Sequence, residues 1–425
     1  MAPVPGVRRV VIMVQENHTT DNYFSGLAPY GANVATGWPV AANPPAKDQS
    51  HDRHAYFNWL TGKSTGAHVA FATDAVLPFY AYLALAGGTF FENHCSGFGT
   101  NSTGNHLLVV GGQSPTLKNP PRSNQPVWDM PSLPGVAADN GLAWKCYAGT
   151  SGYPFEFYQQ LKGSPNIVHS AQFVIDAAGG NLPPLSFLYH DSPLDEHPPA
   201  DVTTGMTAIW QAVSAVVTAG QWADTVFLLT WDDWGGYDDH VATPVVEYTP
   251  DNVQLAFGPR VPLLMFGGPV KVGFDSRWCS HVSIPKTALQ LLGLPTLGVA
   301  RLDNDAGLAD RVDPSAATPP PPAVGTKITL PAPPTPAPPP APLPPPPVAT
   351  PIPVPPVVLR GGGTLPPPND APLTQQPAPP TNSGHTTPGK PPTPTKPTKP
   401  GKPARPTKPS KPGHKATKKG HPGAA

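Results

Sequence analysis

The feature that most limits what this chain can fold into is the uneven distribution of its proline residues. Of the 66 Pro in 425 residues, 38 lie in residues 316–425. That segment also holds 12 of the 27 Lys and Arg residues but a single acid, Asp370. Proline at this density favours an extended polyproline II conformation, and the spaced Lys residues keep it solvated. We therefore expect residues 316–425 to be a low-complexity, disordered tail without a core.

The remaining residues, 1–315, are numerous enough for one large domain with a sizeable core. They contain 26 acidic and 15 basic residues. The net charge of zero is therefore the sum of a negative charge on residues 1–315 and a positive charge on residues 316–425. Binding of nucleic acid through phosphate contacts needs clustered Lys and Arg. We therefore expect no specific nucleic-acid partner for the body.

The cysteines and the apolar runs do not determine the cellular compartment of the protein. The three cysteines, Cys95, Cys146 and Cys279, permit one disulfide at most, so the chain is not a disulfide scaffold. The first apolar run, residues 10–14, is too short for the core of a signal peptide. As written, the sequence therefore predicts neither an export signal nor a membrane span.

Short apolar runs that end in polar residues occur at residues 9–14, 185–189, 225–230 and 261–266. Runs this short are typical of buried parallel strands, and helical spacing of apolar residues follows at 204–219 and 284–292. The alternation predicts an α/β fold with a doubly wound, mostly parallel sheet. We expect the segment between Gly31 and Gly180 to be mostly loops with a few helices. In such sheets ligands bind beyond the carboxyl ends of the strands.

Two polar clusters at these strand ends could bind a cation. In QENHTTD, residues 15–21, a carboxylate and an amide lie side by side, although the same residues could form a turn that caps a helix. In WDDWGGYDDH, residues 231–240, four acids and a histidine follow an apolar run. A solvated acidic loop is the alternative for this second cluster.

Two further clusters could take part in proton transfer or nucleophilic attack. In HDSPLDEHPP, residues 190–199, the two prolines fix the backbone beside His197, a residue type suited to proton transfer near neutral pH. In GFGTNSTGNHLLVVGG, residues 97–112, a hydroxyl group opens an apolar segment, as in a nucleophile or a simple helix cap. The segment lacks the GxSxG pattern, which makes acyl transfer by a Ser-His-Asp triad the weaker interpretation.

Four segments together resemble a known family. QENHTTDNYFSG resembles the motif ENRSFDxxFG, and SPLDEHPPADV contains the motif DEHP. LLTWDDWGGYDDHV resembles TYDEHGGFYDHV, and SHVSIPKTALQLLGLPTLG resembles DHTSVLRFIEERFGLPPLG. The family is the phosphoesterase family that joins bacterial phospholipases C with acid phosphatases, within the alkaline-phosphatase-like superfamily. The motifs keep the family's order over about 300 residues, and the proline-rich tail lies outside them.

The resemblance implies roles for individual residues. It implies metal ligands at Glu16, Asn17, Asp232 and Asp233. It implies a nucleophile three residues before the pair Asn105-His106, which selects Ser102 and leaves Thr103 as the alternative. Active-site histidines are implied at His51, His197, His240 and His281. The chain departs from the family at His18, Thr19 and Thr20, at Gly104 and at Asp233, which replaces a Glu.

The implied function is metal-dependent hydrolysis of phosphoric esters through a phosphoseryl intermediate. Such oxygen ligands suit Mg, Mn or Ca, with Zn possible in this superfamily. The missing further domain after Leu294 favours a small phosphomonoester, as for an acid phosphatase, over a phospholipid, as for a phospholipase C. A non-catalytic surface-binding protein and a serine hydrolase of carboxylic esters are the alternatives.

The family resemblance also points to the bacterial cell envelope or to secretion. For the tail, we weigh contact with an anionic cell-wall polymer or membrane surface against simple solubilisation.

Overall fold

A computed structural model describes residues 2–60, 62–121, 123, 125–243, 245–248 and 254–345, with the short pieces 350–351, 357–358 and 364–365. Most of the predicted tail, including its Lys-rich residues 390–419, lies outside these described residues. Residues 316–345 belong to the same compact unit as the central sheet. No helix in the described ranges has the length and apolar character needed to cross a membrane.

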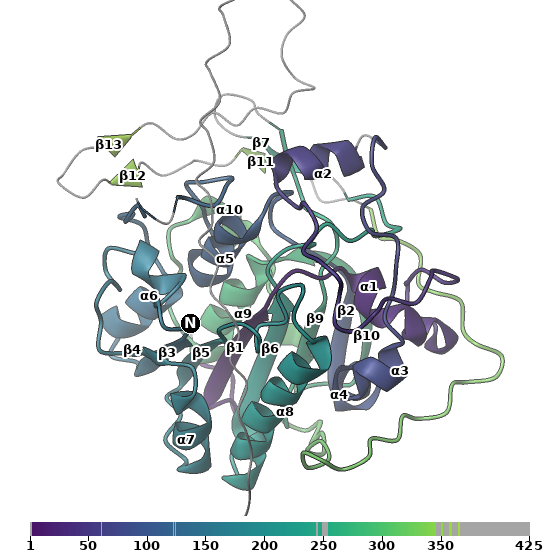
Figure 1. The fold of residues 1–425 in the computed structure, drawn as a ribbon. Coiled ribbons are helices and arrows are strands. Elements are labelled where there is room, and N and C mark those ends of the chain that lie inside the picture. Colours follow the sequence, from purple (N-terminus) through teal and green to yellow (C-terminus); the bar gives the residue numbers. More distant parts are fainter. Residues whose placement is uncertain are drawn as a thin grey trace, which may run out of the picture. The chain divides into compact units, whose positions relative to one another are not determined.

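The centre of the fold is an eight-stranded sheet with the order β10-β2-β9-β6-β1-β5-β3-β4 (Figure 1). All of its strands run in one direction except β9, which pairs antiparallel with both neighbours. This arrangement confirms the predicted mostly parallel α/β sheet. The strands are β1 (Arg9–Gln15), β2 (Gly88–Cys95), β3 (Trp144–Ala148), β4 (Ile167–His169), β5 (Leu185–Tyr189), β6 (Thr225–Trp231), β9 (Leu263–Phe266) and β10 (Gly273–Ser280). Short strands form two smaller sheets: β7 (Val245–Tyr248), β8 (Gln254–Ala256) and β11 (Thr350–Pro351), and β12 (Val357–Val358) with β13 (Thr364–Leu365).

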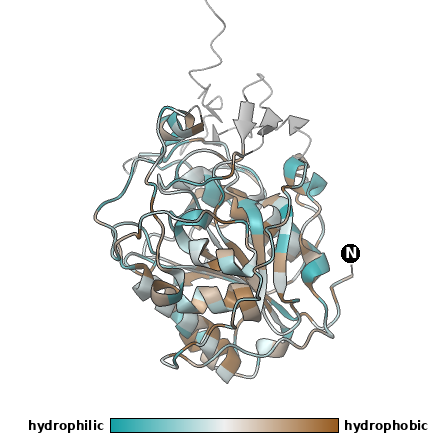
Figure 2. Cartoon of the chain, turned by 90° about the vertical axis from the view of Figure 1, so that its right-hand side faces the viewer, coloured by the Kyte–Doolittle hydropathy of each residue, from teal (hydrophilic) through white to brown (hydrophobic). Residues whose placement is uncertain are grey.

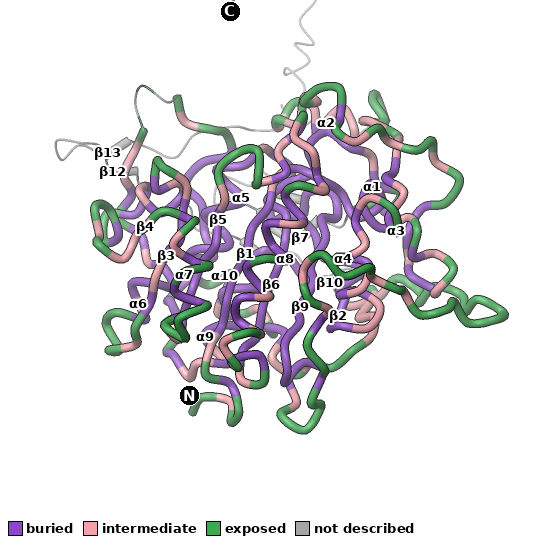
Figure 3. The backbone as a smooth tube through the Cα atoms, turned by 60° about the horizontal axis from the view of Figure 1, so that its bottom comes forward, coloured by how far each residue is buried: buried purple, intermediate pink, exposed green. Residues whose placement is uncertain are grey.

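Helices cover both faces of the sheet, because alternate residues of each strand point to opposite sides. Val10, Ile12 and Val14 of β1 join a hydrophobic cluster with α5, α6 and α9, whereas Val11 and Met13 join another with α1, α4, α7 and α8. Hydrophobic residues therefore concentrate in the sheet and on the helix faces against it (Figure 2). The central strands are buried, whereas the edge strand β4 and most of the edge strand β10 are only partly buried (Figure 3).

The helical elements of the described chain have the following bounds. They are α1 (Thr20–Phe24), η1 (Ser25–Tyr30), α2 (Arg53–Leu60), α3 (Thr73–Val76), α4 (Pro78–Tyr82), η2 (Leu83–Gly87), α5 (Ser102–Gly111), α6 (Leu133–Asp139), η3 (Phe155–Phe157), α7 (Gln172–Ala178), α8 (Val202–Thr218), η4 (Trp222–Asp224), α9 (Ser283–Leu292), α10 (Ala300–Asn304) and η5 (Ala309–Arg311). The helices predicted at 204–219 and 284–292 are confirmed as α8 and α9. The side chain of Asp201 begins α8 by accepting hydrogen bonds from the backbone N–H groups of Thr203 and Thr204.

Two predictions from the sequence are wrong in detail. The run at 261–266 does form a strand, but β9 is antiparallel, so its beginning lies at the edge where β1 and β6 end. The segment 31–180, expected to be mostly loops, contributes β2, β3 and β4 to the sheet. The strand β2 contains polar residues and therefore does not form an apolar run in the sequence, yet all its residues are buried. For example, Asn93 donates to the carbonyl oxygen of Ser276, and His94 bonds to that of Val261.

Candidate active site

The parallel pairing of β1 with β6 brings two pairs of polar residues together. Gln15, the last residue of β1, lies opposite Trp231, the last residue of β6. The residues that follow these two strands, Glu16 with Asn17 and Asp232 with Asp233, therefore meet at one edge of the sheet. The backbone N–H of Asn17 donates to Asp232 Oδ1 over 3.1 Å.

A tight turn after Asp233 keeps the two strand ends close together. Gly235 has a φ of +58°, and a Cβ at this position would lie 2.1 Å from the carbonyl oxygen of Asn17. A side chain cannot fit there, so the Gly235 position requires glycine. Asn17 itself has a φ of +67°, a conformation that asparagine tolerates better than most residues. The close approach fixes where Asn17 and Asp233 lie relative to each other.

Ser102 reaches the same edge from the first turn of α5. Its Oγ donates to Asp233 Oδ2 over 3.2 Å. The neighbouring Thr103 hydroxyl instead accepts a hydrogen bond from Tyr153, and its backbone N–H donates to Asn119 Oδ1. Of the two candidate nucleophiles, Ser102 is thus the one bonded to the carboxylate cluster.

His106 is a site residue to which the sequence analysis gave no role. Its Nε2 lies 3.2 Å from Glu16 Oε1 and 3.2 Å from Asp232 Oδ2. His106 follows Ser102 by four residues, one turn of α5, so both side chains lie on one helix face. This spacing is the signal that could have revealed it.

The cluster of acids shifts the pKa values of its members in opposite directions. Burial alone would lower the pKa of His106, but the charges of Asp232 and Glu16 outweigh it and raise that pKa to about 10. Burial would raise the pKa of Asp232, but the adjacent His106 holds it at about 2. Burial, with the charge of Asp232 beside it, raises the pKa of Asp233 well above its ordinary value. The cluster therefore has more negative charge than His106 can balance.

The side-chain amide of Asn17 gives a test of whether a cation fits this cluster. One end of the amide lies 2.9 Å from Asp232 Oδ1 and 3.3 Å from Asp233 Oδ1, and the other lies 3.0 Å from His197 Nε2. His197 Nδ1 bonds to the carbonyl oxygen of Pro198. Burial would lower the pKa of His197, but the charge of Glu16 and this hydrogen bond raise it above its ordinary value, which favours the protonated ring. The protonated ring donates from Nε2 to the Asn17 amide oxygen, and the amide nitrogen donates to Asp232 and Asp233.

Rotation of the amide by 180° would turn its oxygen toward the two carboxylates, where a divalent cation would be held by all three side chains. With that rotation the side chains of Glu16, Asn17, Asp232 and Asp233 would offer oxygen atoms to a divalent cation, and the ligand set implied by the family motifs stays a prediction.

The predicted histidines divide into three environments. His51 and His197 lie near each other, with their ring centres 6.3 Å apart, and together with Asp48 they form a second group of potential ligands. His240 instead bonds to Asp21 Oδ2 through both its backbone N–H and its ring Nδ1, each at 2.7 Å. Asp21 also pairs with Arg260, which is fully buried. The structure therefore places His240 in a separate ion network.

His281 is fully buried between two backbone groups. It accepts a hydrogen bond from the backbone N–H of Gly97 and donates to the carbonyl oxygen of Trp231 over 2.9 Å. Burial, together with the nearby His94, lowers the pKa of His281 well below its ordinary value. The neutral ring thus joins the loop before α5 to the end of β6, so its contacts position Ser102 relative to Asp232.

Glu196 is a second residue that the sequence analysis overlooked, although it precedes His197 in the DEHP motif. Its fully buried carboxylate accepts hydrogen bonds from Tyr23, Tyr80, Gln15 and Trp231. Because Gln15 and Trp231 end β1 and β6, Glu196 anchors the His197 loop to the two strands that carry the cluster. Burial, the largest influence, raises the pKa of Glu196 to about 7.

Comparison with known proteins gives matches over most of the domain. The sequence profile of the Phosphoesterase family matches residues 7–295. Non-specific phospholipase C1 of Arabidopsis thaliana is 27% identical over 203 residues, which are 41% of this chain and 38% of that protein. Phospholipase C B of Mycobacterium tuberculosis is 23% identical over 323 residues, which are 57% of this chain and 62% of that protein. The chain thus spans less than two thirds of these relatives.

Among solved structures, a protein of the alkaline phosphatase superfamily from Vibrio parahaemolyticus is similar. Its TM-score is 0.38 at 13% identity, over 68% of this chain and 67% of that one.

We predict that Glu196→Gln lowers the free energy of unfolding by about 1–3 kcal/mol, because an NH₂ group would then face two of the four donors. The variant Tyr82→Phe, on the same helix as Tyr80 but outside this set of bonds, should have little effect. Chemical denaturation with a fluorescence readout measures both. An unchanged free energy for Glu196→Gln would contradict the anchoring role.

The difference in the free energy of unfolding between the wild type and Glu196→Gln should change with pH. Because burial raises the pKa of Glu196 from its ordinary value of 4.5 to about 7, the folded state binds a proton more tightly than the unfolded state. Its contribution is complete below pH 4.5 and is lost as the pH rises through 7. The wild type should therefore lose stability relative to Glu196→Gln over that range.

Proposed function

The chain belongs to the phosphoesterase family, and from that premise we propose that it hydrolyses phosphoric esters at the edge where β1 and β6 end. The observation that carries the proposal is the bond from Ser102 Oγ to Asp233, inside a cluster completed by Glu16, Asn17 and Asp232. A hydroxyl beside hard oxygen ligands is the arrangement expected of a metal-assisted nucleophile. Helix α5 adds the positive end of its dipole at Ser102, which favours an anionic group there.

The residues of the cluster have distinct tasks in the proposed reaction. Glu16, Asn17, Asp232 and Asp233 would hold a divalent cation, which supplies charge compensation and Lewis acidity when bound. Ser102 Oγ, with its proton directed at Asp233 Oδ2, would attack phosphorus and form a phosphoseryl group as the bond to the leaving oxygen breaks. His197 or His51 would give that oxygen a proton, and water would then release the phosphate.

The charges at the site favour a phosphodiester over a phosphomonoester. A monoester presents two negative charges near neutral pH, which need several cationic partners. The structure places His240 beside Asp21, and Arg260, a buried cation at this edge, is bound by Asp21 and Asp239. A diester carries one charge and needs fewer cations. We therefore propose cleavage of a phospholipid-type diester, as the names of the relatives suggest, with an acid-phosphatase activity as the second candidate.

We predict that a chromogenic phosphocholine ester is hydrolysed faster than a chromogenic phosphomonoester, and that a chelator stops both reactions. The measurement compares initial rates with and without chelator, with Ser102→Ala as the blank. Faster turnover of the monoester would instead select the acid-phosphatase variant. Chelator-insensitive cleavage of carboxylic esters would indicate a serine hydrolase.

We predict that Asp232→Asn lowers metal affinity and turnover by about 100-fold or more, because it removes a charge from the ligand set. Asp238→Asn is the matched control, since Asp238 bonds to Trp59 and His68 outside the cluster. Metal content by mass spectrometry and a circular dichroism spectrum distinguish metal loss from unfolding. Normal metal content in Asp232→Asn would remove this residue from the ligands.

We predict that Ser102→Ala lowers turnover by about 1,000-fold or more, whereas Thr103→Ala costs less than about 10-fold. The reason is that Ser102, and not Thr103, bonds to the carboxylate cluster. Acid quenching during turnover, followed by peptide sequencing in a mass spectrometer, should find phosphate on Ser102. Phosphate on Thr103 would show that the neighbouring hydroxyl is the nucleophile.

A further inference from the structure

Residues 316–345 follow the surface of the domain without forming a helix or strand of their own. Aromatic side chains of the domain donate hydrogen bonds to backbone carbonyl groups of this segment at four places. The bonds run from Trp222 Nε1 to Thr318 (2.7 Å), from Trp210 Nε1 to Pro322 (2.8 Å), from the Tyr30 hydroxyl to Pro331 (2.7 Å) and from Trp278 Nε1 to Pro344 (2.8 Å). The donors come from η4, α8, η1 and β10, so four separate elements contribute.

These donors match the chemistry of a proline-rich backbone. Proline has a carbonyl acceptor but no N–H, and its extended chain makes no internal hydrogen bonds. A surface can therefore bind it chiefly by offering donors, and aromatic side chains combine an apolar ring with such a donor. Aromatic-lined grooves are a recurring way to bind proline-rich peptides.

Other contacts fix the segment between and beyond these bonds. Val324, Ile328 and Leu330 pack against the hydrophobic cluster that includes α4 and α8. Thr318 is buried, and its backbone N–H donates to the carbonyl oxygen of Gly268 over 2.9 Å. At Gly31, which has a φ of +86°, a Cβ would lie 2.6 Å from Cγ of Pro338. Glycine at that position thus allows the segment to pass close to the domain.

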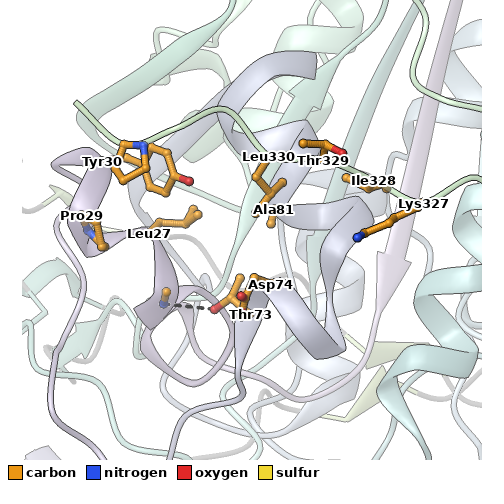
Figure 4. Close-up of a pocket in the computed structure, with 12 residues that line it drawn as sticks. Leu27, Pro29, Tyr30, Thr73, Asp74, Ala81, Lys327, Ile328, Thr329 and Leu330 are labelled. Atoms are coloured by element: carbon orange, nitrogen blue, oxygen red, sulfur yellow. Dashed lines mark hydrogen bonds between the residues drawn. The ribbon is translucent and has the colours of Figure 1, made fainter. Parts of the chain in front are cut away.

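Between two of the donors the segment spans a hollow. A cavity of about 560 Å³ lies between Leu27, Tyr30, Asp74 and Ala81 of the domain and residues 327–330 and Pro333 of the segment (Figure 4). Beside this cavity, the stretch is attached by the packing of Ile328 and Leu330 and by the hydrogen bonds from Tyr30 and Trp210.

We propose that Tyr30, Trp210, Trp222 and Trp278 form one docking track for an extended proline-rich segment, occupied by residues 318–344 of the same chain. The track begins at Trp222, just before β6 starts, and ends at Trp278, near the end of β10. It thus leads the chain from one edge of the sheet to the edge that carries Ser102 and Asp232. This inference does not depend on the proposed catalytic function.

Trypsin provides a direct test on the full chain. Lys327 is the only Lys or Arg between residues 312 and 359, and it lies between the carbonyl acceptors at Pro322 and Pro331. Cleavage after Lys327 under native conditions therefore reports release of this stretch. The variants Tyr30→Phe and Trp210→Phe each remove one donor and leave an aromatic ring at the position, which for residue 210 can still pack on Phe79.

We expect cleavage after Lys327 to be slow in the wild type, about fivefold faster in each single variant and about 30-fold faster in the double variant. Trp128→Phe is the matched control, because its buried indole N–H has no hydrogen-bond partner in the described chain; its cleavage rate should equal that of the wild type. Circular dichroism verifies that every variant is folded.

Two results would overturn the proposal. Wild-type cleavage as fast as in the double variant would show that these donors do not hold the segment. Protection that increases with protein concentration would show that the segment of a second copy occupies the track.

Discussion

The pairing of β1 with β6 is the constraint on which the site depends. With Gln15 opposite Trp231, the backbone N–H of Asp232 donates to the carbonyl oxygen of Gln15, and that of Asn17 donates to Asp232. A shift by one residue would turn alternate side chains to the wrong face and separate these groups. The side chains of Gln15 and Trp231 also bind Glu196. The same two residues therefore set the positions of the ligand cluster and of the His197 loop.

The cluster that this pairing creates is electrostatically costly. Asp232 and Asp233 are fully buried beside Glu16, where like charges repel strongly and burial disfavours ionisation. His106 offsets part of this charge from its position one turn along α5. The remaining negative charge would favour a divalent cation at this edge, so the electrostatic cost of the cluster and the proposed function have the same origin.

The sequence predicts the parts of the fold that local patterns encode. The runs that became β1, β5 and β6 are mostly apolar and are followed directly by polar residues, so these polar residues locate the edge of the proposed site. The direction of β9 depends on its neighbours β2 and β6, which lie far away in the sequence. His240 could not be separated from His197 by motif alone, because its partner Asp21 lies 219 residues away. The direction of β9 and the environment of His240 are set by contacts between residues far apart in the sequence, and not by the spacing of residues within a motif.

The composition of the proline-rich segment shows which groups it lacks, but it does not show how the segment can bind to a folded domain. With few N–H groups the segment makes few sheet hydrogen bonds, and with few apolar side chains it does not form a core of its own. Its carbonyl groups remain, and a folded domain can satisfy them with donors that point outward. Tyr30, Trp210, Trp222 and Trp278 have this geometry, although they are scattered over about 250 residues of sequence. A low-complexity segment can thus be ordered by the domain beside it, because the information for its placement lies in that domain.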